Sequence, residues 1–360
     1  MTIWILVGNG ILHNVNLICF IHFLALNLRF YNNTMKFIFH FLRLIRFPNL
    51  VIIALTQYAI RFGIIYPFLN QAGLDLFLSE KLFGLLVGAT VLIAASGYII
   101  NDYFDVKLDH VNKPKQMIVG KMISRRQAMF MHTLVNVSGI FIAAYVAFAI
   151  GHPFLVLIQL ISAGLLWFYS VNFKKQILIG NVIIAALTAL VPFTAGYYEI
   201  VVLFDNLSQK QVNSTIETES IRSLIFSIKY LLYWVVGYSA FAFILTFIRE
   251  IIKDCEDIEG DEAFGCKTFP IVYGISKAKK AANYTVAFLL VLITFLEFIQ
   301  VNSEDWISFT YFLVLISLPL IWLMNKIRKA KTKKHFFIIS QVIKVIMLVG
   351  ILYTAIIYTF

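Results

Sequence analysis

The sequence predicts an all-α fold, a polytopic membrane bundle of nine transmembrane helices. Of its 360 residues, 60% are hydrophobic and only 14% are charged, whereas soluble domains carry about 25% charged residues. The apolar runs reach the roughly 20 residues that a helix needs to cross a bilayer core of about 30 Å. These runs do not alternate as the strands of a membrane barrel do. Helices satisfy their own backbone groups in lipid, so a helical bundle follows.

Hydropathy places nine spans along the chain, and the charge of the loops orients them. Lys and Arg collect before the first span and after each even-numbered span, while the opposite loops are mostly acidic. Because cytoplasmic loops are enriched in Lys and Arg, we expect a protein of the cytoplasmic membrane whose C-terminus lies outside. The spans are 48–69, 82–101, 128–149, 153–171, 177–203, 227–251, 282–301, 306–325 and 336–359.

The N-terminal segment 1–34 is apolar but is broken by polar residues such as His13 and Asn14. No Lys or Arg precedes it, so it makes a poor signal peptide. A tenth span here would start the chain outside. Alternatively Met35 is the true start, since the stretch that follows it has the pattern of a basic amphipathic helix. We favour a dispensable extension over 1–34 and a single transmembrane domain over 35–360.

Cysteine spacing and net charge argue against a disulfide-linked or zinc-binding protein and against a nucleic-acid-binding protein. Cys19, Cys255 and Cys266 have a spacing that fits neither a disulfide framework nor a zinc site. We expect unpaired thiols. The net charge of +11 is explained by the cytoplasmic loops of a membrane protein, so no nucleic-acid partner is expected.

Two aspartate triads with identical spacing end the second and sixth spans. The second triad lies 152 residues after the first (254 minus 102). Ser124 and Ser276 follow the two triads at similar distances, and each is expected to cap the next helix. The repeat indicates two related halves. The acids are Asp102, Asp105 and Asp109 in "NDYFDVKLD", and Asp254, Asp257 and Asp261 in "DCEDIEGD".

Offsets of zero, three and seven put the three carboxylates of each triad on one helix face, where like charges repel. A hard divalent cation with oxygen ligands would compensate them. Magnesium takes one or two carboxylates and shares its other positions with waters and substrate phosphates, so two facing triads could hold metal and a diphosphate. Solvated acids at a helix end are the simpler alternative, which a matched pair disfavours.

The motifs "NDYFDVKLD", "NKP", "GKMISRRQA", "DCEDIEGD" and "KTFPIVYG" resemble those of the UbiA superfamily of intramembrane prenyltransferases. The resemblance runs from about Phe37 to the C-terminus. It implies triads that bind Mg²⁺ and the diphosphate of an isoprenoid donor, within a cavity that opens sideways to lipid. "LIRFPNLVIIALTQY" and "AASGYIINDYFD" look most like the branch that transfers geranylgeranyl groups to geranylgeranylglycerol phosphate.

Position by position, the resemblance implies roles for further residues. The main metal-side acids, and hence the catalytic residues, would be Asp102, Asp105, Asp254 and Asp257. Asp109 and Asp261 would bind metal through water or order the loops. Tyr169 would bind substrate, but it is equally well explained as an aromatic residue at the membrane interface. The remaining substrate-binding residues would be Arg46, Asn49, Asn101, Lys113, Lys121, Arg125 and one of Lys174 and Lys175, between which the sequence does not decide.

The expected activity is therefore Mg²⁺-dependent transfer of a prenyl group, with geranylgeranyl favoured, from its diphosphate to an acceptor in the membrane. A glycerol-phosphate lipid precursor is favoured as acceptor, and an aromatic quinone precursor is the alternative. Outside enzymes, a secondary transporter would also contain repeats and membrane acids, but such acids usually lie near the midplane. A non-catalytic scaffold is a third interpretation.

Overall fold

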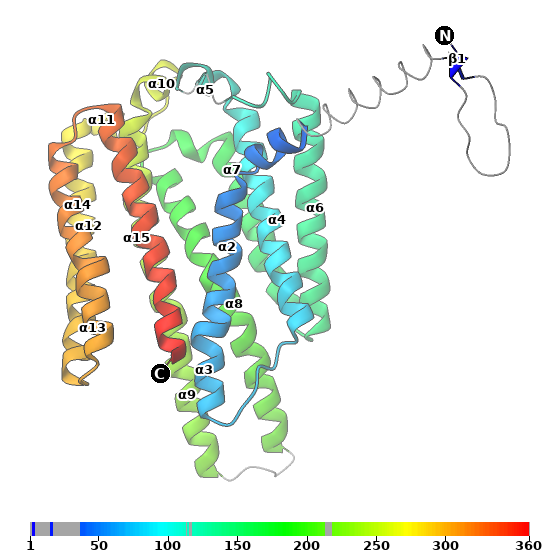
Figure 1. Ribbon diagram of the computed structural model, residues 1–360, viewed down its shortest axis with the longest axis vertical. Helices are drawn as coiled ribbons and strands as arrows, with labels where there is room; N and C mark the ends of the chain where they lie inside the picture. Colours follow the sequence, from blue (N-terminus) through cyan, green and yellow to red (C-terminus); the bar gives the residue numbers. More distant parts are fainter. Residues whose placement is uncertain are drawn as a thin grey trace.

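A computed structural model of the chain has the expected helical bundle (Figure 1). It describes residues 2–3, 15–16, 37–112, 114, 117–212 and 218–359, with side chains from residue 37 onward except at 209–227 and 359. Within these ranges nine helical spans are long and apolar enough to cross a membrane, which confirms the prediction. They are Phe47–Gln71, Glu80–Phe104, Arg125–Ala149, Pro153–Val171, Ile179–Ser208, Ile228–Glu256, Ile275–Asn302, Trp306–Lys329 and Lys333–Tyr358.

The elements follow one another as helices joined by short turns. A helical segment over 37–44 precedes the first span, where the sequence predicted an amphipathic helix. The named helices are α2 (Phe47–Ile60), η1 (Arg61–Ile65), α3 (Tyr66–Gln71), α4 (Glu80–Phe104), α5 (Val106–Asn112), α6 (Arg125–Ala149), η2 (Pro153–Leu155), α7 (Val156–Val171), η3 (Phe173–Lys175), α8 (Ile179–Val212), α9 (Thr218–Glu256), α10 (Ile258–Ala263), α11 (Phe269–Tyr273), α12 (Ile275–Asn302), α13 (Trp306–Phe312), η4 (Leu313–Ser317), α14 (Leu318–Lys329) and α15 (Lys333–Thr359).

The N-terminal segment contributes two short strands. β1 (Thr2–Ile3) pairs antiparallel with β2 (Val15–Asn16), with Thr2 opposite Asn16. The rest of 1–34 lies outside the described residues, so its assignment as an extension stays a prediction. The bundle itself begins with the helical segment that starts at residue 37.

Helix starts follow the capping chemistry of the sequence at one predicted position and depart from it at the other. Ser124 caps α6 in a capping box: its hydroxyl accepts from the Gln127 N–H at 3.3 Å, and its own N–H donates to Gln127 Oε1 at 2.9 Å. The prediction for Ser276 was wrong, because α12 already starts after Gly274. Gly274 has φ of 86°, a conformation that glycine adopts without steric cost.

Two spans contain a π-helical segment that ends two residues before a proline, a feature that hydropathy cannot reveal. In the first span, η1 precedes Pro67, and in the eighth, η4 precedes Pro319. Proline lacks a backbone N–H and clashes with the carbonyl four residues earlier. A wider π turn accommodates such a disruption while the helix continues across the membrane.

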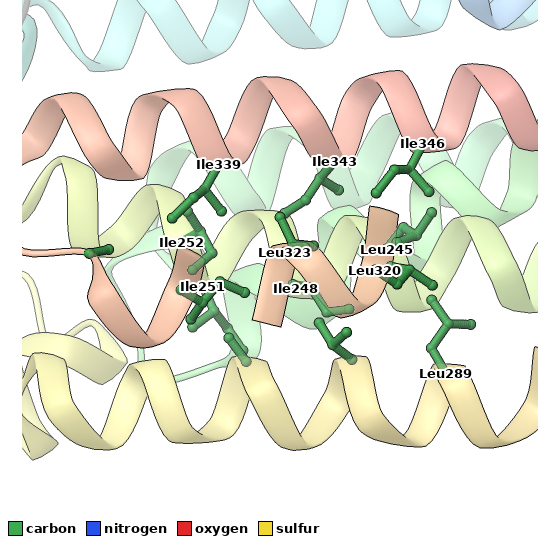
Figure 2. Packing of buried hydrophobic residues seen from close by; sticks show 14 of the residues in the cluster. Leu245, Ile248, Ile251, Ile252, Leu289, Leu320, Leu323, Ile339, Ile343 and Ile346 are labelled. Carbon is green, nitrogen blue, oxygen red and sulfur yellow. The ribbon is translucent and has the colours of Figure 1, made fainter. Parts of the chain in front are cut away.

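The bundle has one large core in the second half of the sequence and two further clusters centred on the first half. The core of the second half joins α9, α12, α14 and α15 through residues that recur every three or four positions (Figure 2). In the first half, separate clusters join α2, α4, α6 and the neighbouring helices. The residues labelled in Figure 2 are Leu245, Ile248, Ile251, Ile252, Leu289, Leu320, Leu323, Ile339, Ile343 and Ile346.

Candidate active site

The two aspartate motifs lie at the same end of the bundle. The short helices α5 and α10, which follow the two motifs, are neighbours at the top of Figure 1. Asp102 is in the last turn of α4 and Asp254 is in the last turn of α9. Both acids therefore mark the end of a membrane span, as the sequence predicted.

Each motif breaks its helix at the middle aspartate, so the expectation of three carboxylates on one continuous helix face was wrong. Asp105 (φ −85°, ψ 1°) ends α4, and Asp257 (φ −100°, ψ 10°) precedes α10. Both residues lie in the bridge region of backbone conformation, which departs from the helical values. The turn moves Asp109 and Asp261 onto separate short helices, and it relieves the repulsion of three like charges on one straight face.

Asn112, which the sequence analysis did not select, joins the two motifs. Its side-chain amide donates to the Asp257 carbonyl at 3.3 Å, and its Oδ1 accepts from the Gly260 N–H at 3.1 Å. A Cβ at Gly260 would lie 2.4 Å from the Asn112 side chain, so the contact requires glycine. The only sequence signal was its place in "NKP" directly after the first motif.

Two cations contact the first motif. The Arg46 guanidinium forms an ion pair with Asp102 at 3.1 Å and stacks on the Tyr98 ring at 4.8 Å. The Lys174 ammonium, from the turn η3, forms an ion pair with Asp105. Both pairs join residues more than 50 positions apart in the sequence. They bring α2 and η3 to the end of α4.

Lys174, and not Lys175, is the lysine that reaches the acids. The sequence left Lys174 and Lys175 open, and both lie in the single turn η3. Lys175 instead accepts a hydrogen bond from the Lys267 N–H at its backbone carbonyl, at 2.8 Å. At Gly180, a Cβ would lie 2.9 Å from the Lys174 Cα, so glycine permits α8 to start directly beneath this turn.

The second motif has its own polar partners. Asn181 of α8 donates to Asp254 Oδ2 at 2.9 Å and is itself buried. Glu250, one turn before Asp254, is buried and pairs with Arg249 at 2.7 Å and with Lys253 at 3.1 Å. The sequence analysis did not identify Asn181, which lies near the start of the mostly apolar fifth span.

Tyr169 lies between the two motifs. Its hydroxyl is within electrostatic range of Asp105 in the first motif, of Asp254 in the second, and of Glu250 one turn before Asp254. The structure thus brings Tyr169 near both motifs, and its role in substrate binding stays a prediction. Cys266 lies in the same region: burial raises the pKa of its thiol, Asp261 raises it further, and Lys175 and Lys174 oppose the increase.

Cys255 and Cys266 are both free thiols, as expected. Cys19 lies outside the described residues.

The other predicted substrate-binding residues contact structural partners. Asn49 donates to the Tyr98 hydroxyl at 3.3 Å, and the Asn101 carbonyl accepts from the Asp105 N–H at 2.9 Å. Lys121 donates to the Pro114 carbonyl at 2.8 Å. Arg125 stacks over the ring of Tyr103, the sequence neighbour of Asp102, at 4.4 Å. Lys113 lies outside the described residues.

The donor groups of the two motifs fit magnesium held jointly with a substrate. In the described part of the chain, no three His, Cys, Asp or Glu side chains come together as a metal site of their own. Magnesium is usually bound by one or two carboxylates together with waters and substrate phosphates. The oxygen-only acids at the ends of α4 and α9 offer such ligands, and magnesium would supply positive charge to a bound diphosphate.

Comparison with known proteins decides the family. The profile of the UbiA prenyltransferase family matches residues 62–342, well over half of the chain. The protein belongs to the UbiA prenyltransferase family. It is therefore a prenyltransferase integral to the membrane, and the transporter and scaffold interpretations are set aside.

Individual relatives agree with this assignment. Digeranylgeranylglyceryl phosphate synthase of Saccharolobus solfataricus is 30% identical over 241 residues, covering 66% of this chain and 73% of the relative. The synthase of the same name from Methanosphaera stadtmanae is 26% identical, covering 72% of this chain and 81% of the relative.

Two solved structures share the fold. One, of digeranylgeranylglyceryl phosphate synthase in membranes, has a TM-score of 0.54 at 21% identity and covers 89% of this chain and 98% of its own. The other, a UbiA homologue of Archaeoglobus fulgidus bound to GPP and Mg²⁺, has a TM-score of 0.53 at 17% identity, with 89% and 100% covered.

Proposed function

We propose that this enzyme transfers a geranylgeranyl group from its diphosphate to a glycerol-phosphate lipid, in a reaction that requires Mg²⁺. The observation that supports it most directly is the joining of the two aspartate motifs by Asn112 at one end of an apolar bundle. A prenyl diphosphate matches this arrangement of charged motifs at the end of an apolar bundle, because it has an ionic head and an apolar tail. The site would bind the head at the membrane surface while the tail enters the bundle.

The carboxylates would hold the diphosphate through magnesium. The ligands would be Asp102 and Asp105 from the first motif, and Asp254 and Asp257 from the second. Asp109 and Asp261, on α5 and α10, would bind water or order the loops. Asn181 fixes the orientation of Asp254 by donating to one of its oxygens at 2.9 Å, and such outer partners strengthen the binding of a metal.

The cations would bind the phosphate oxygens directly. Arg46 and Lys174 contact Asp102 and Asp105 in the structure, and a bound diphosphate would compete with the carboxylates for them. As the allylic C–O bond breaks, negative charge moves onto the leaving diphosphate, and fixed cations stabilise that charge. The apolar bundle would exclude water from the developing carbocation. The acceptor hydroxyl would then attack the allylic carbon to form an ether, and its proton would pass to the released diphosphate.

The choice of acceptor follows the relatives. Both relatives described above are named digeranylgeranylglyceryl phosphate synthase, which implies a glycerol-phosphate acceptor for this chain too. An aromatic quinone precursor is the alternative acceptor. The charge of the loops supports a location in the cytoplasmic membrane, in which the motifs would face the cytoplasm and the C-terminus would lie outside.

The test is a product assay on the purified enzyme in detergent. It would be given prenyl diphosphates of different length together with geranylgeranylglycerol phosphate or a hydroxybenzoate. We expect the ether lipid as the main product by mass spectrometry, with geranylgeranyl diphosphate preferred and no product after chelation of Mg²⁺. Preferential prenylation of the aromatic acid would contradict the proposed acceptor.

A further inference from the structure

Three half-buried cations lie near Glu250, the acid one turn before the second motif. Arg249 and Lys253 are one turn apart on α9, and Lys344 comes from the middle of α15. Lys344 is eleven residues (344 minus 333) into α15, which begins at Lys333. At about 1.5 Å per residue, this places Lys344 roughly 16 Å along the helix from its start.

Packing fixes these cations near one another. Ile248 of α9 and Ile343 of α15, each the sequence neighbour of one cation, are completely buried in the same core (Figure 2). The start of α15 is held at the end of the bundle that carries the motifs, because Lys333 donates to the Asn112 carbonyl at 3.2 Å. Lys344 is consequently within electrostatic range of Arg249, Lys253 and Arg46, and also of the Glu250 carboxylate.

The cations of this group outnumber the carboxylates that pair with them. Glu250 is the carboxylate that pairs with both Arg249 and Lys253. Arg46 is already paired with Asp102. In the described part of the chain, Lys344 makes no hydrogen bond or ion pair, and the buried Nε–H of Arg249 has no acceptor. A cation at membrane depth is costly unless it faces a partner or a polar cavity.

We propose that Arg249, Lys253 and Lys344 bind the phosphate monoester of the lipid acceptor. This inference rests on the proposed function and adds the place where the acceptor is recognised. The donor diphosphate would bind to the acids through metal, while the acceptor phosphate would bind to the cations without it. Because Arg249 and Lys253 lie on α9 beside Glu250 and Asp254, the two anions would be neighbours, which brings the acceptor hydroxyl toward the donor.

A binding measurement without metal or donor tests this directly. The full-length enzyme in detergent with EDTA would be titrated with a long-chain monoacylglycerol phosphate and, separately, with the uncharged monoacylglycerol. We expect the wild type to prefer the phosphate lipid. Lys344→Met and Arg249→Gln should each weaken its binding by about tenfold to a hundredfold, since each removes a charge-assisted hydrogen bond. Binding of the uncharged lipid should stay unchanged.

Matched variants complete the design. Lys280→Met and Arg126→Gln remove the same charges from exposed positions at the same end of the bundle, and neither should alter binding. Lys344→Arg should restore most of the affinity for the phosphate lipid. The proposal would be overturned if the wild type showed no preference for the phosphate lipid. It would also be overturned if Lys344→Met left the binding of both lipids unchanged, or weakened the binding of both equally.

Kinetics separate this proposal from the proposed function. In the complete reaction, Lys344→Met should raise the KM for the acceptor by about tenfold or more and leave the KM for the donor within about twofold. A rise in the KM for the donor alone would assign the cations to the diphosphate and overturn the proposal. If the wild type prenylates only aromatic acids but the EDTA titration still shows phosphate binding at Lys344, the proposed acceptor fails while the anion site stands.

Discussion

The Lys174 ammonium contacts the Asp105 carboxylate, although the two residues are 69 positions apart in the sequence. The contact joins the turn after the fourth span to the break in the first aspartate motif. Lysine can bind a carboxylate in one state of an enzyme and a phosphate in another, because it presents a compact charge on a flexible stem. The pair therefore places a cation where the donor diphosphate is expected.

Substitution of the two adjacent lysines should give different results. Lys174→Met should lower kcat/KM by about tenfold to a hundredfold, because it removes a charge-assisted contact to the leaving group. Lys175→Met should reduce it by less than about twofold, since Lys175 acts through its backbone carbonyl. Steady-state rates of diphosphate release measure both. Equal losses in the two variants would refute the assignment of Lys174.

A double-mutant cycle can test whether Asn112 joins the motifs. In the wild type, Gly260→Ala should lower stability by about 1–3 kcal/mol, because its Cβ would lie 2.4 Å from the Asn112 side chain. In an Asn112→Ala background the same substitution should be neutral or stabilising, since alanine favours a helix over glycine by about 1 kcal/mol. Thermal unfolding in detergent reports the four proteins. An equal effect in both backgrounds would exclude the contact.

Asn181 offers a test of how Asp254 is held. Asn181→Ala should raise the Mg²⁺ concentration for half-maximal activity by about tenfold to a hundredfold, because it removes the hydrogen bond that orients the Asp254 carboxylate. Thr188→Ala on the same helix is the control, since the Thr188 hydroxyl donates to the Ile184 carbonyl within α8. A Mg²⁺ response that is identical in Asn181→Ala and wild type would remove Asn181 from the site.

The sequence sufficed for the features that depend on local pattern. Nine spans follow from hydropathy, and the shared spacing of the motifs that begin at Asp102 and Asp254 placed both at one end of the bundle. The breaks at Asp105 and Asp257 were not predicted, because the spacing of the three aspartates is the same in an unbroken helix. The breaks are local changes of backbone angle, and i to i+4 backbone bonds continue across them, as from the Asp109 N–H to the Asp105 carbonyl at 2.8 Å.

Long-range contacts were the other feature beyond prediction. Asn112 and Asp257 are 145 residues apart, and no local pattern indicates that they meet. Lys344 likewise stands as a single charge in an apolar run, and only the packing of α15 against α9 brings it toward Arg249. Such contacts depend on tertiary structure, which a single sequence does not reveal.

The central claim is that the two aspartate motifs form one metal and diphosphate site. It is tested most directly by Mg²⁺-dependent diphosphate release from geranylgeranyl diphosphate in Asp102→Asn, Asp257→Asn and the double variant. If the acids act as one unit, each single substitution should abolish release almost as completely as both together. Near-normal turnover in either single variant would contradict the account.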